Sequence, residues 1–163
     1  MTIHSHAHIG HVHLTVANLS RSVEFYRDIL GFEVTAQYGD SAIFLSAGGY
    51  HHHIGLNTWE GEGALPPPSG HSGLYHFAIL FPSRKELAKA LKSLIDAKYP
   101  ITGASDHGVS EAIYLQDPDS IGVELYADRP RSEWKINNDG EVEMITKPLD
   151  LNGLLSELED TNS

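Results

Sequence analysis

The feature that most constrains the fold is an internal repeat. The stretch HVHLTVANLSRSVEFYRDIL, which starts at His11, and the stretch HFAILFPSRKELAKALKSLI, which starts at His76, follow one plan. Each begins with a histidine, continues as a short apolar strand, turns at Ser-Arg and enters an amphipathic helix. Such self-similarity indicates that one supersecondary unit has been used twice. The sequence therefore predicts two similar modules.

Both predicted helices carry boundary signals. Gly31 marks the end of the first, and the second begins with a capping-box pattern at 83–86, Ser-Arg-Lys-Glu. The residues at helical spacing in the first helix are Val23, Tyr26, Ile29 and Leu30. The predicted buried stripe of the second consists of Leu87, Ala90, Leu91, Leu94 and Ile95.

Short strands follow each helix. After the first helix we expect strands at 32–37, 41–45 and 52–59, with glycine-containing turns between them. After the second we expect strands near 100–104, at 111–116 and at 121–127, the last two joined by an Asp-Pro-Asp-Ser turn. The order β-α-β-β-β, used twice, predicts an α+β fold in which the two modules form a curved, partly closed mixed sheet.

The predicted organisation is a single domain over residues 1–130. Its modules cover 8–60 and 73–128, and a Gly- and Pro-rich linker at 61–72 joins them. Residues 129–163 form a C-terminal extension, with one short helix expected near 149–158.

Composition excludes several classes of function. The chain has 11 basic and 22 acidic residues, a formal net charge of −11, which opposes binding to nucleic acid phosphates. It has no apolar run of membrane-spanning length and no signal-peptide pattern at its start, so we expect a cytoplasmic protein without a membrane partner. It has no cysteine. Any metal ion must therefore be held by His, Asp or Glu.

Strand alternation places several polar side chains on one side. If Val12, Leu14 and Val16 face the first helix, His11 and His13 face away from it, and the same argument turns His76 away from the second helix. On the last strand Glu124 lies opposite the apolar Val123 and Leu125, and Tyr114 is expected to line the same concavity. His11, His76 and Glu124 then form a set of two imidazoles and one carboxylate. Such a set suits non-haem Fe(II) that acts with O₂.

With these residues the chain resembles the vicinal oxygen chelate superfamily, which includes glyoxalase I, bleomycin-resistance proteins and type I extradiol dioxygenases such as catechol 2,3-dioxygenase. The resemblance covers about residues 8–130. It implies metal ligands at His11 in IGHVHLTV, His76 in LYHFAIL and Glu124 in GVELY. The extradiol pattern is matched by His107, Ile113-Tyr114, Asp117-Pro118 and Glu124, whereas Ser105 and Ser120 depart from it.

The resemblance implies an Fe(II)-dependent extradiol ring-cleaving dioxygenase whose partners are a catechol-type aromatic substrate and O₂. Manganese, nickel and zinc are the alternative metals. In this reading His52 acts as an acid-base catalyst, His107 binds a substrate oxygen, and Tyr114 orients the substrate. The segment from His52 matches the family pattern His-x-(Val/Leu)-(Gly/Ala)-Phe, but strand alternation favours His53, and a β-bulge would reconcile the two.

Other functions stay open. Gly55 stands where similar glyoxalases place a fourth ligand, and this favours a dioxygenase over a glyoxalase-like lyase or isomerase. A metal-free binding protein of the bleomycin-resistance type is the third reading, although it would need no ligand set. Family members also exchange modules between chains, so a homodimer is a possible oligomeric state.

Some of the candidate residues also have an alternative structural role. Tyr114 would then be a strand residue that only packs against its neighbours, and His107 would lie in an exposed loop. The remaining histidines that we assign to the surface are His4, His6, His8 and His71.

Overall fold

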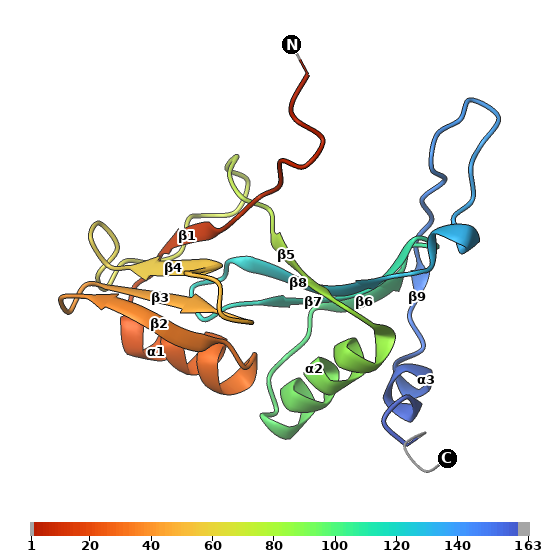
Figure 1. The fold of residues 1–163 in the computed structure, drawn as a ribbon. Helices are drawn as coiled ribbons and strands as arrows, with labels where there is room; N and C mark the ends of the chain where they lie inside the picture. The colour runs from red at the N-terminus through yellow and green to blue at the C-terminus, as the bar shows by residue number, and fades with distance from the viewer. Residues whose placement is uncertain (1, 160–163) are drawn as a thin grey trace. The chain divides into compact units, whose positions relative to one another are not determined.

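The computed structural model describes residues 2–159 (Figure 1). The chain divides into two compact units, Met1–His71 and Ser72–Ser163. Each unit contains one β-α-β-β-β module and forms its own mixed sheet. The predicted α+β class and the duplicated module are therefore confirmed.

The first unit has a four-stranded sheet in the order β1-β4-β3-β2. Strands β1 and β4 pair in parallel, and the other pairs are antiparallel. The elements are β1 (Val12–Thr15), α1 (Leu19–Val23), the π-helix η1 (Glu24–Ile29), β2 (Glu33–Tyr38), β3 (Ala42–Ser46) and β4 (Ile54–Asn57). The helix covers one face of this sheet and buries Val23, Phe25 and Tyr26.

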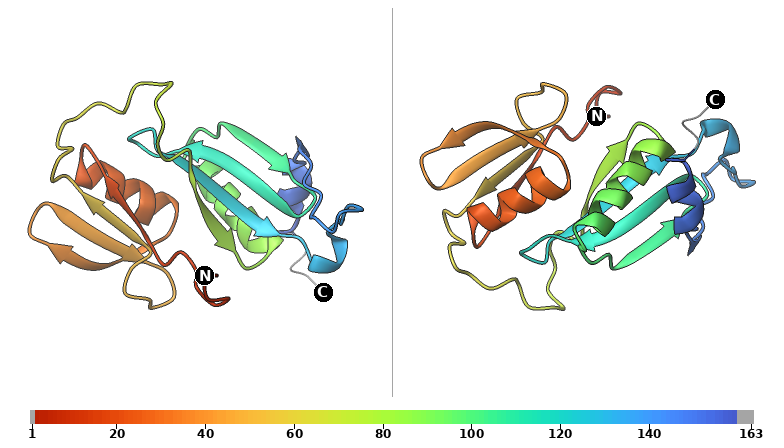
Figure 2. Two further views of the ribbon diagram at one scale, coloured as in Figure 1. Left: turned by 90° about the horizontal axis from the view of Figure 1, so that it is seen from above. Right: turned by 90° about the horizontal axis from the view of Figure 1, so that it is seen from below.

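The second unit has a five-stranded sheet in the order β5-β8-β7-β6-β9, in which β5 and β8 pair in parallel. The elements are β5 (Phe77–Phe81), α2 (Arg84–Asp96), β6 (Gly103–Asp106), β7 (Ser110–Gln116), β8 (Gly122–Asp128), the 3-10 turn η2 (Arg131–Glu133), β9 (Lys147–Pro148) and α3 (Leu151–Ser156). Helices α2 and α3 lie against the same face of the sheet, as Figure 2 shows from both sides. The opposite face is left for the polar side chains.

The helix boundaries predicted at Gly31 and Ser83 are confirmed. Asn18 caps α1 by accepting a hydrogen bond from the Arg21 amide, and Ser83 caps α2 by accepting one from the Glu86 amide. Gly31 ends the first helix with φ +85°, a value that side-chain-bearing residues rarely adopt. In α2, the predicted stripe is confirmed at Leu87, Leu91 and Leu94, which are buried. It is wrong at Ile95, which is 52% exposed, and it omitted Ala88, which is buried.

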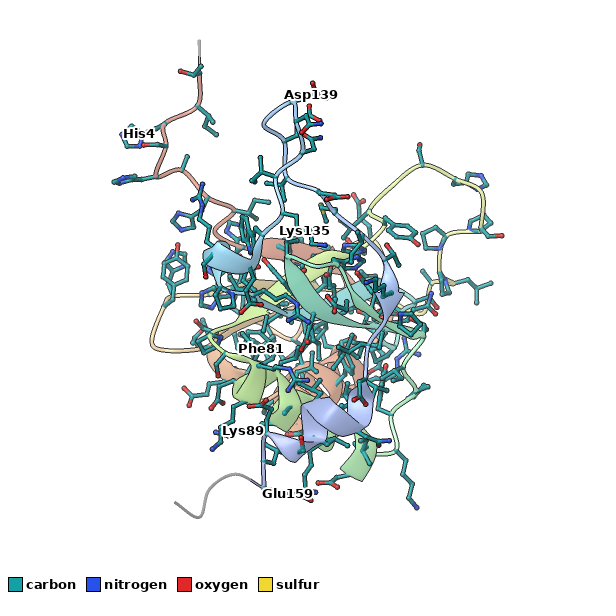
Figure 3. The ribbon with its side chains drawn as sticks, turned by 90° about the vertical axis from the view of Figure 1, so that its right-hand side faces the viewer. His4, Phe81, Lys89, Lys135, Asp139 and Glu159 are labelled. Atoms are coloured by element: carbon teal, nitrogen blue, oxygen red, sulfur yellow. The ribbon has the colours of Figure 1, made fainter. Side chains whose placement is uncertain are left out.

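The C-terminal extension is part of the second unit. Its strand β9 adds to the edge of the sheet beside β6, and Leu154 of α3 is fully buried. Before β9, residues 135–143 form a hairpin in which Ile136 and Val142 are bridged; Lys135 lies near its base and Asp139 at its tip (Figure 3). The helix predicted near 149–158 is confirmed, with observed bounds Leu151–Ser156. Among residues 2–159, no helix has the length and apolar character needed to span a membrane.

Candidate metal and substrate site

Three adjacent strands of the second unit bring the predicted site residues together. The register pairs Ala78 of β5 with Glu124 of β8, and Glu124 with Tyr114 of β7. Their side chains share the face away from α2, because the alternate residues Val123 and Leu125 are fully buried on the other. The expectation that Tyr114 and Glu124 share one face is confirmed.

His76 and Glu124 form the central contact. Nε2 of His76 lies 2.9 Å from Oε2 of Glu124, and their side chains are 31% and 13% exposed. An imidazole nitrogen and a carboxylate oxygen that face each other at this distance can share one proton or one cation between them. A carboxylate this far removed from water requires such a partner.

Gly122 permits this approach. A Cβ on Gly122 would stand 2.2 Å from the carbonyl oxygen of Tyr75 and 2.9 Å from the Cβ of His76. A side chain here would force the backbone apart, because the nearest atom belongs to the main chain. The glycine of the GVELY motif therefore allows the strand that carries Glu124 to lie directly against the segment that carries His76.

Tyr114 and His107 continue the line of contacts. Nε2 of His107 lies 2.7 Å from the Tyr114 hydroxyl, which in turn lies 3.4 Å from Oε1 of Glu124. Burial, and after it the neighbouring Glu124 carboxylate, raises the pKa of Tyr114 to about 12, so the phenol keeps its proton at neutral pH. His107 is partly buried, and its ring is held on both sides. The alternative of an exposed loop is therefore wrong for His107.

These side chains border a pocket within the second unit. Tyr75 is exposed beside His76, with their ring centroids 5.4 Å apart. The lining residues are Tyr75, His76, Thr102, Gly103, His107, Tyr114, Leu115, Gln116, Gly122 and Val123.

The turn between β7 and β8 is closed by Asp117, whose Oδ1 accepts hydrogen bonds from the amides of Asp119 and Ile121. Ser120 adopts φ +65° there, a backbone conformation that favours glycine over other residues.

The first unit gathers imidazoles on the corresponding strand ends. The rings of His11 and His52 lie 4.5 Å apart, and Phe44 packs 5.1 Å from His52. Burial, and after it the charge of His11, lowers the pKa of His52, so this ring is neutral at neutral pH. His53 points elsewhere, because its Nδ1 lies 3.0 Å from the hydroxyl of Ser46.

The strand expected at 52–59 is shorter than predicted, because β4 runs only from Ile54 to Asn57. Its pairing with β3 is regular over these residues, and the His53 amide donates to the Leu45 carbonyl just before them. The choice between His52 and His53, and the bulge that would reconcile them, stay predictions. A register shift lies in β2 at Thr35, whose hydroxyl donates to the carbonyl of His51. That bond anchors the histidine segment.

Gly55 occupies the position in the first unit that Glu124 occupies in the second. It pairs with His13, as Glu124 pairs with Ala78. A Cβ on Gly55 would meet the His13 ring at 2.9 Å, and this ring also packs against Phe44 and Trp59. Position 55 therefore provides neither a side chain that could bind a metal nor the space for a larger residue.

The predicted ligands are divided between the units. His11 lies in the first, and His76 and Glu124 lie in the second. Within each unit, the described residues contain no group of three His, Asp or Glu side chains that could hold a metal ion. Convergence of all three ligands on one ion thus stays a prediction, as do the roles of His52, His107 and Tyr114. The histidines at 4, 6, 8 and 71 are exposed, as expected.

Sequence reasoning missed one charged network. The carboxylate of Glu111 is buried on the helix-facing side of β7, where it accepts from Nε of Arg84 at 2.7 Å and from Nη2 of Arg129 at 2.8 Å. Arg129 also binds Asp106, the residue before His107. A signal existed, because Glu111 shares its strand parity with Ile113 and Leu115. A carboxylate on an apolar face requires a cation nearby.

The fold and the site define the class: a duplicated β-α-β-β-β scaffold that presents imidazole and carboxylate side chains beside a pocket. The family model described as Glyoxalase/Bleomycin resistance protein/Dioxygenase superfamily matches residues 8–125. The chain belongs to this superfamily.

Individual relatives agree with this assignment. The chain is 45% identical over 159 residues to the catechol-2,3-dioxygenase of Bacillus subtilis, covering 98% of this chain and 55% of that protein. It is 30% identical to the manganese-dependent 2,3-dihydroxybiphenyl 1,2-dioxygenase of Geobacillus genomosp. 3, over 75% of this chain and 37% of that protein. The chain thus spans about half, or less, of these relatives' lengths.

A solved structure supports the fold. The glyoxylase/bleomycin resistance protein/dioxygenase domain from Frankia sp. EAN1pec matches with a TM-score of 0.62 and 25% identity, over 77% of this chain and all of that one.

Proposed function

We propose that the chain is an extradiol ring-cleaving dioxygenase that uses Fe(II), held by His11, His76 and Glu124, to open a catechol-type ring with O₂. The observation that carries the proposal is the unbroken line of contacts from His76 through Glu124 and Tyr114 to His107. The relatives named as dioxygenases for aromatic diols support it.

The residues fit a metal of this kind. His76 and Glu124 already offer a nitrogen and an oxygen donor side by side, and two imidazoles with one carboxylate are the donor set of non-haem Fe(II) sites. When bound, the ion would supply Lewis-acid activation of the substrate's two oxygens and a position for O₂. Manganese is the first alternative, because a relative is named for it; nickel and zinc are the others.

The side chains around this set have separate tasks in the proposal. A catecholic substrate must lose a proton to bind through its oxygens, and the lowered pKa of His52 makes that ring a neutral acceptor. Tyr114 keeps its own proton, and its hydroxyl oxygen can accept a hydrogen bond from a substrate hydroxyl. His107 holds the Tyr114 hydroxyl in place from the side of β6. Gly55 and the His13 ring beside it disfavour a glyoxalase-type fourth ligand.

The proposal is tested by ring cleavage with the full chain. The metal-free chain is loaded anaerobically with Fe(II), Mn(II), Ni(II) or Zn(II), and each form is mixed with a catechol panel and ¹⁸O₂. We expect a yellow ring-opened semialdehyde that carries two ¹⁸O atoms, with Fe(II) or Mn(II) but not with Zn(II). Absence of product from every catechol, with bound iron verified, would refute the activity. Tight catechol binding by the metal-free chain alone would favour the binding-protein reading.

A further inference from the structure

The C-terminal extension reaches His107 through the main chain of Ile145. Nδ1 of His107 lies 2.9 Å from the Ile145 carbonyl oxygen, and the Ile145 amide donates to the His107 carbonyl at 3.1 Å. One residue is thus bound twice by another that lies 38 positions further along the chain. Strand β9 follows at once and pairs with β6, so the contact lies at the start of a sheet edge.

This contact determines where the His107 ring carries its proton. A carbonyl oxygen accepts hydrogen bonds but cannot donate them, so the proton between the two atoms belongs to Nδ1. In the neutral imidazole the other nitrogen, Nε2, is then an acceptor. Nε2 is the atom that lies 2.7 Å from the Tyr114 hydroxyl. The Tyr114 hydroxyl has one proton and two acceptors in reach, and Nε2 of His107 at 2.7 Å is closer than Oε1 of Glu124 at 3.4 Å, so the proton is directed to His107.

We propose that Ile145 is a positioning residue: its carbonyl fixes His107 as the Nδ1–H tautomer, and this makes Nε2 the acceptor that orients the Tyr114 hydroxyl. The role in catalysis rests on the proposed function, whereas the tautomer itself does not. The extension is thus a working part of the site that orients a pocket side chain, in addition to its packing role. The polar contacts of the ring support this, since the only other near group is the Thr146 hydroxyl, at 3.5 Å, among the described residues.

Further contacts between the extension and the rest of the second unit surround the His107–Ile145 contact. Gly108, in the tight turn after His107, has φ +76°, and a Cβ there would meet the Ile145 side chain at 3.2 Å. On the other face of the sheet Arg84 binds the Gly153 carbonyl of α3 at 3.1 Å. Arg129 binds Asp106 at 2.9 Å and so fixes the start of the turn. These bonds tie both sides of the His107–Ile145 contact to the sheet.

The test is ¹⁵N NMR of the imidazoles in the full chain as purified, at neutral pH, with the His107 signals assigned by their loss in His107→Gln. The expected spectrum shows a proton on Nδ1 of His107 and a bare Nε2. A His107 ring that carries its only proton on Nε2, or that exchanges evenly between both tautomers, would overturn the proposal. The tautomer is read from the wild-type chain and needs no catalytic turnover; the His107→Gln variant serves only to assign the signals.

Two glycine variants sharpen the test. Gly108→Ala strains the turn and presses on Ile145, so we expect the His107 ring to become a mixture of tautomers. Gly140→Ala is the matched control, because Gly140 lies in the same extension at φ +82° but has no neighbour within 4 Å. It should lose similar thermal stability and keep the pure tautomer. If the two variants gave the same wild-type tautomer, Ile145 would not be what fixes the ring.

Activity measurements on the same samples separate the two proposals. Failure of ring cleavage in the wild-type chain would remove the proposed function and leave the tautomer assignment standing. The converse result, ring cleavage with an Nε2–H ring, would remove the positioning role alone.

Discussion

The two units have the same order of strands, but they differ at one cross-strand pair of residues. The larger residue of the pair lies on the first strand in one unit and on the last strand in the other. In the second unit a small residue on the first strand, Ala78, faces a carboxylate on the last strand, Glu124. In the first unit a large ring, His13, faces a glycine, Gly55. The total volume at the position is similar, whereas the chemistry is opposite. One copy of the module presents a carboxylate at this position, and the other fills the same place with an imidazole that packs against Phe44 and Trp59.

This difference shows that the two modules share a backbone fold, while the residue at a single position determines which functional group each module presents. Both copies keep a histidine directly before their first strand, at His11 and His76. Among residues 2–159, only the second copy shows a carboxylate in reach of that histidine, at 2.9 Å. The two modules therefore contribute different side chains to the proposed site, and substitutions can test each module separately.

The largest effect is expected from removing that carboxylate. Glu124→Ala should lower the affinity for Fe(II) by more than about 100-fold, since loss of even an outer-shell partner costs 10–100-fold, and ring cleavage should disappear with the metal. Metal content after dialysis and calorimetric titration measure this. Asp128→Ala, an exposed carboxylate on the same strand, is the control and should retain the ion. Full metal binding by Glu124→Ala would show that the second unit is not the donor copy.

A smaller loss is expected when the ligands stay and the neighbouring hydroxyl is removed. Tyr114→Phe should lower kcat by about 100-fold, the lower range for a positioned proton donor or acceptor, with unchanged metal content. Steady-state kinetics beside metal analysis test this. Tyr126→Phe, two residues along β8 from Glu124, is the matched phenol and should have wild-type kcat. Equal rates for the two variants would reduce Tyr114 to a packing residue.

Paired glycine substitutions compare the two copies directly. Gly122→Ala meets a main-chain oxygen at 2.2 Å and should destabilise the fold by about 1–3 kcal/mol, as overpacking does. Gly55→Ala meets only the rotatable ring of His13, at 2.9 Å, and should cost clearly less. Urea unfolding measures both, and Gly103→Ala, whose nearest contact is an ordinary 3.8 Å, is the control. A larger cost at Gly55 would contradict the close approach at His76.

The smallest effect concerns acid stability around the turn that carries His107. Burial raises the pKa of Asp106, but the Gly108 amide and the Arg129 guanidinium outweigh it and leave the pKa below its ordinary value. A lowered pKa in the folded state contributes stability that is complete above the unfolded value of about 4 and is lost as the pH falls through the folded value. Asp106→Asn should therefore flatten the stability profile below about pH 4. Urea unfolding midpoints measured at pH values between about 2 and 7 test this. An unchanged dependence of stability on pH in the variant would count against the Arg129 contact.

Much of this architecture could be predicted from local pattern. Strand alternation placed Tyr114 and Glu124 on one face, and the register confirms it, because the period of two is fixed by backbone geometry. Gly31 as a helix stop and Ser83 as a cap also followed from local rules. The π-helix did not, since the bond from the Leu30 amide to the Phe25 carbonyl depends on packing and not on spacing.

The parts that escaped prediction depend on partners distant in the chain. The start of β4 at Ile54 moved His52 and His53 off the strand, because the ladder begins only where Leu45 pairs with Ile54. The contact of His107 with Ile145 left no trace in residue types, since a main-chain carbonyl is the same in every residue. Glu111 did leave one, as a carboxylate in an apolar run, and its two arginine partners explain it.

The account rests on one ion shared by both copies of the module. A crystal of the Fe(II)-loaded chain, grown anaerobically and measured on both sides of the iron absorption edge, tests this most directly. We predict one anomalous peak at coordination distance from an imidazole nitrogen of His11, one of His76 and a carboxylate oxygen of Glu124. Iron bound without any one of these three residues, or only by the exposed N-terminal histidines, would contradict it.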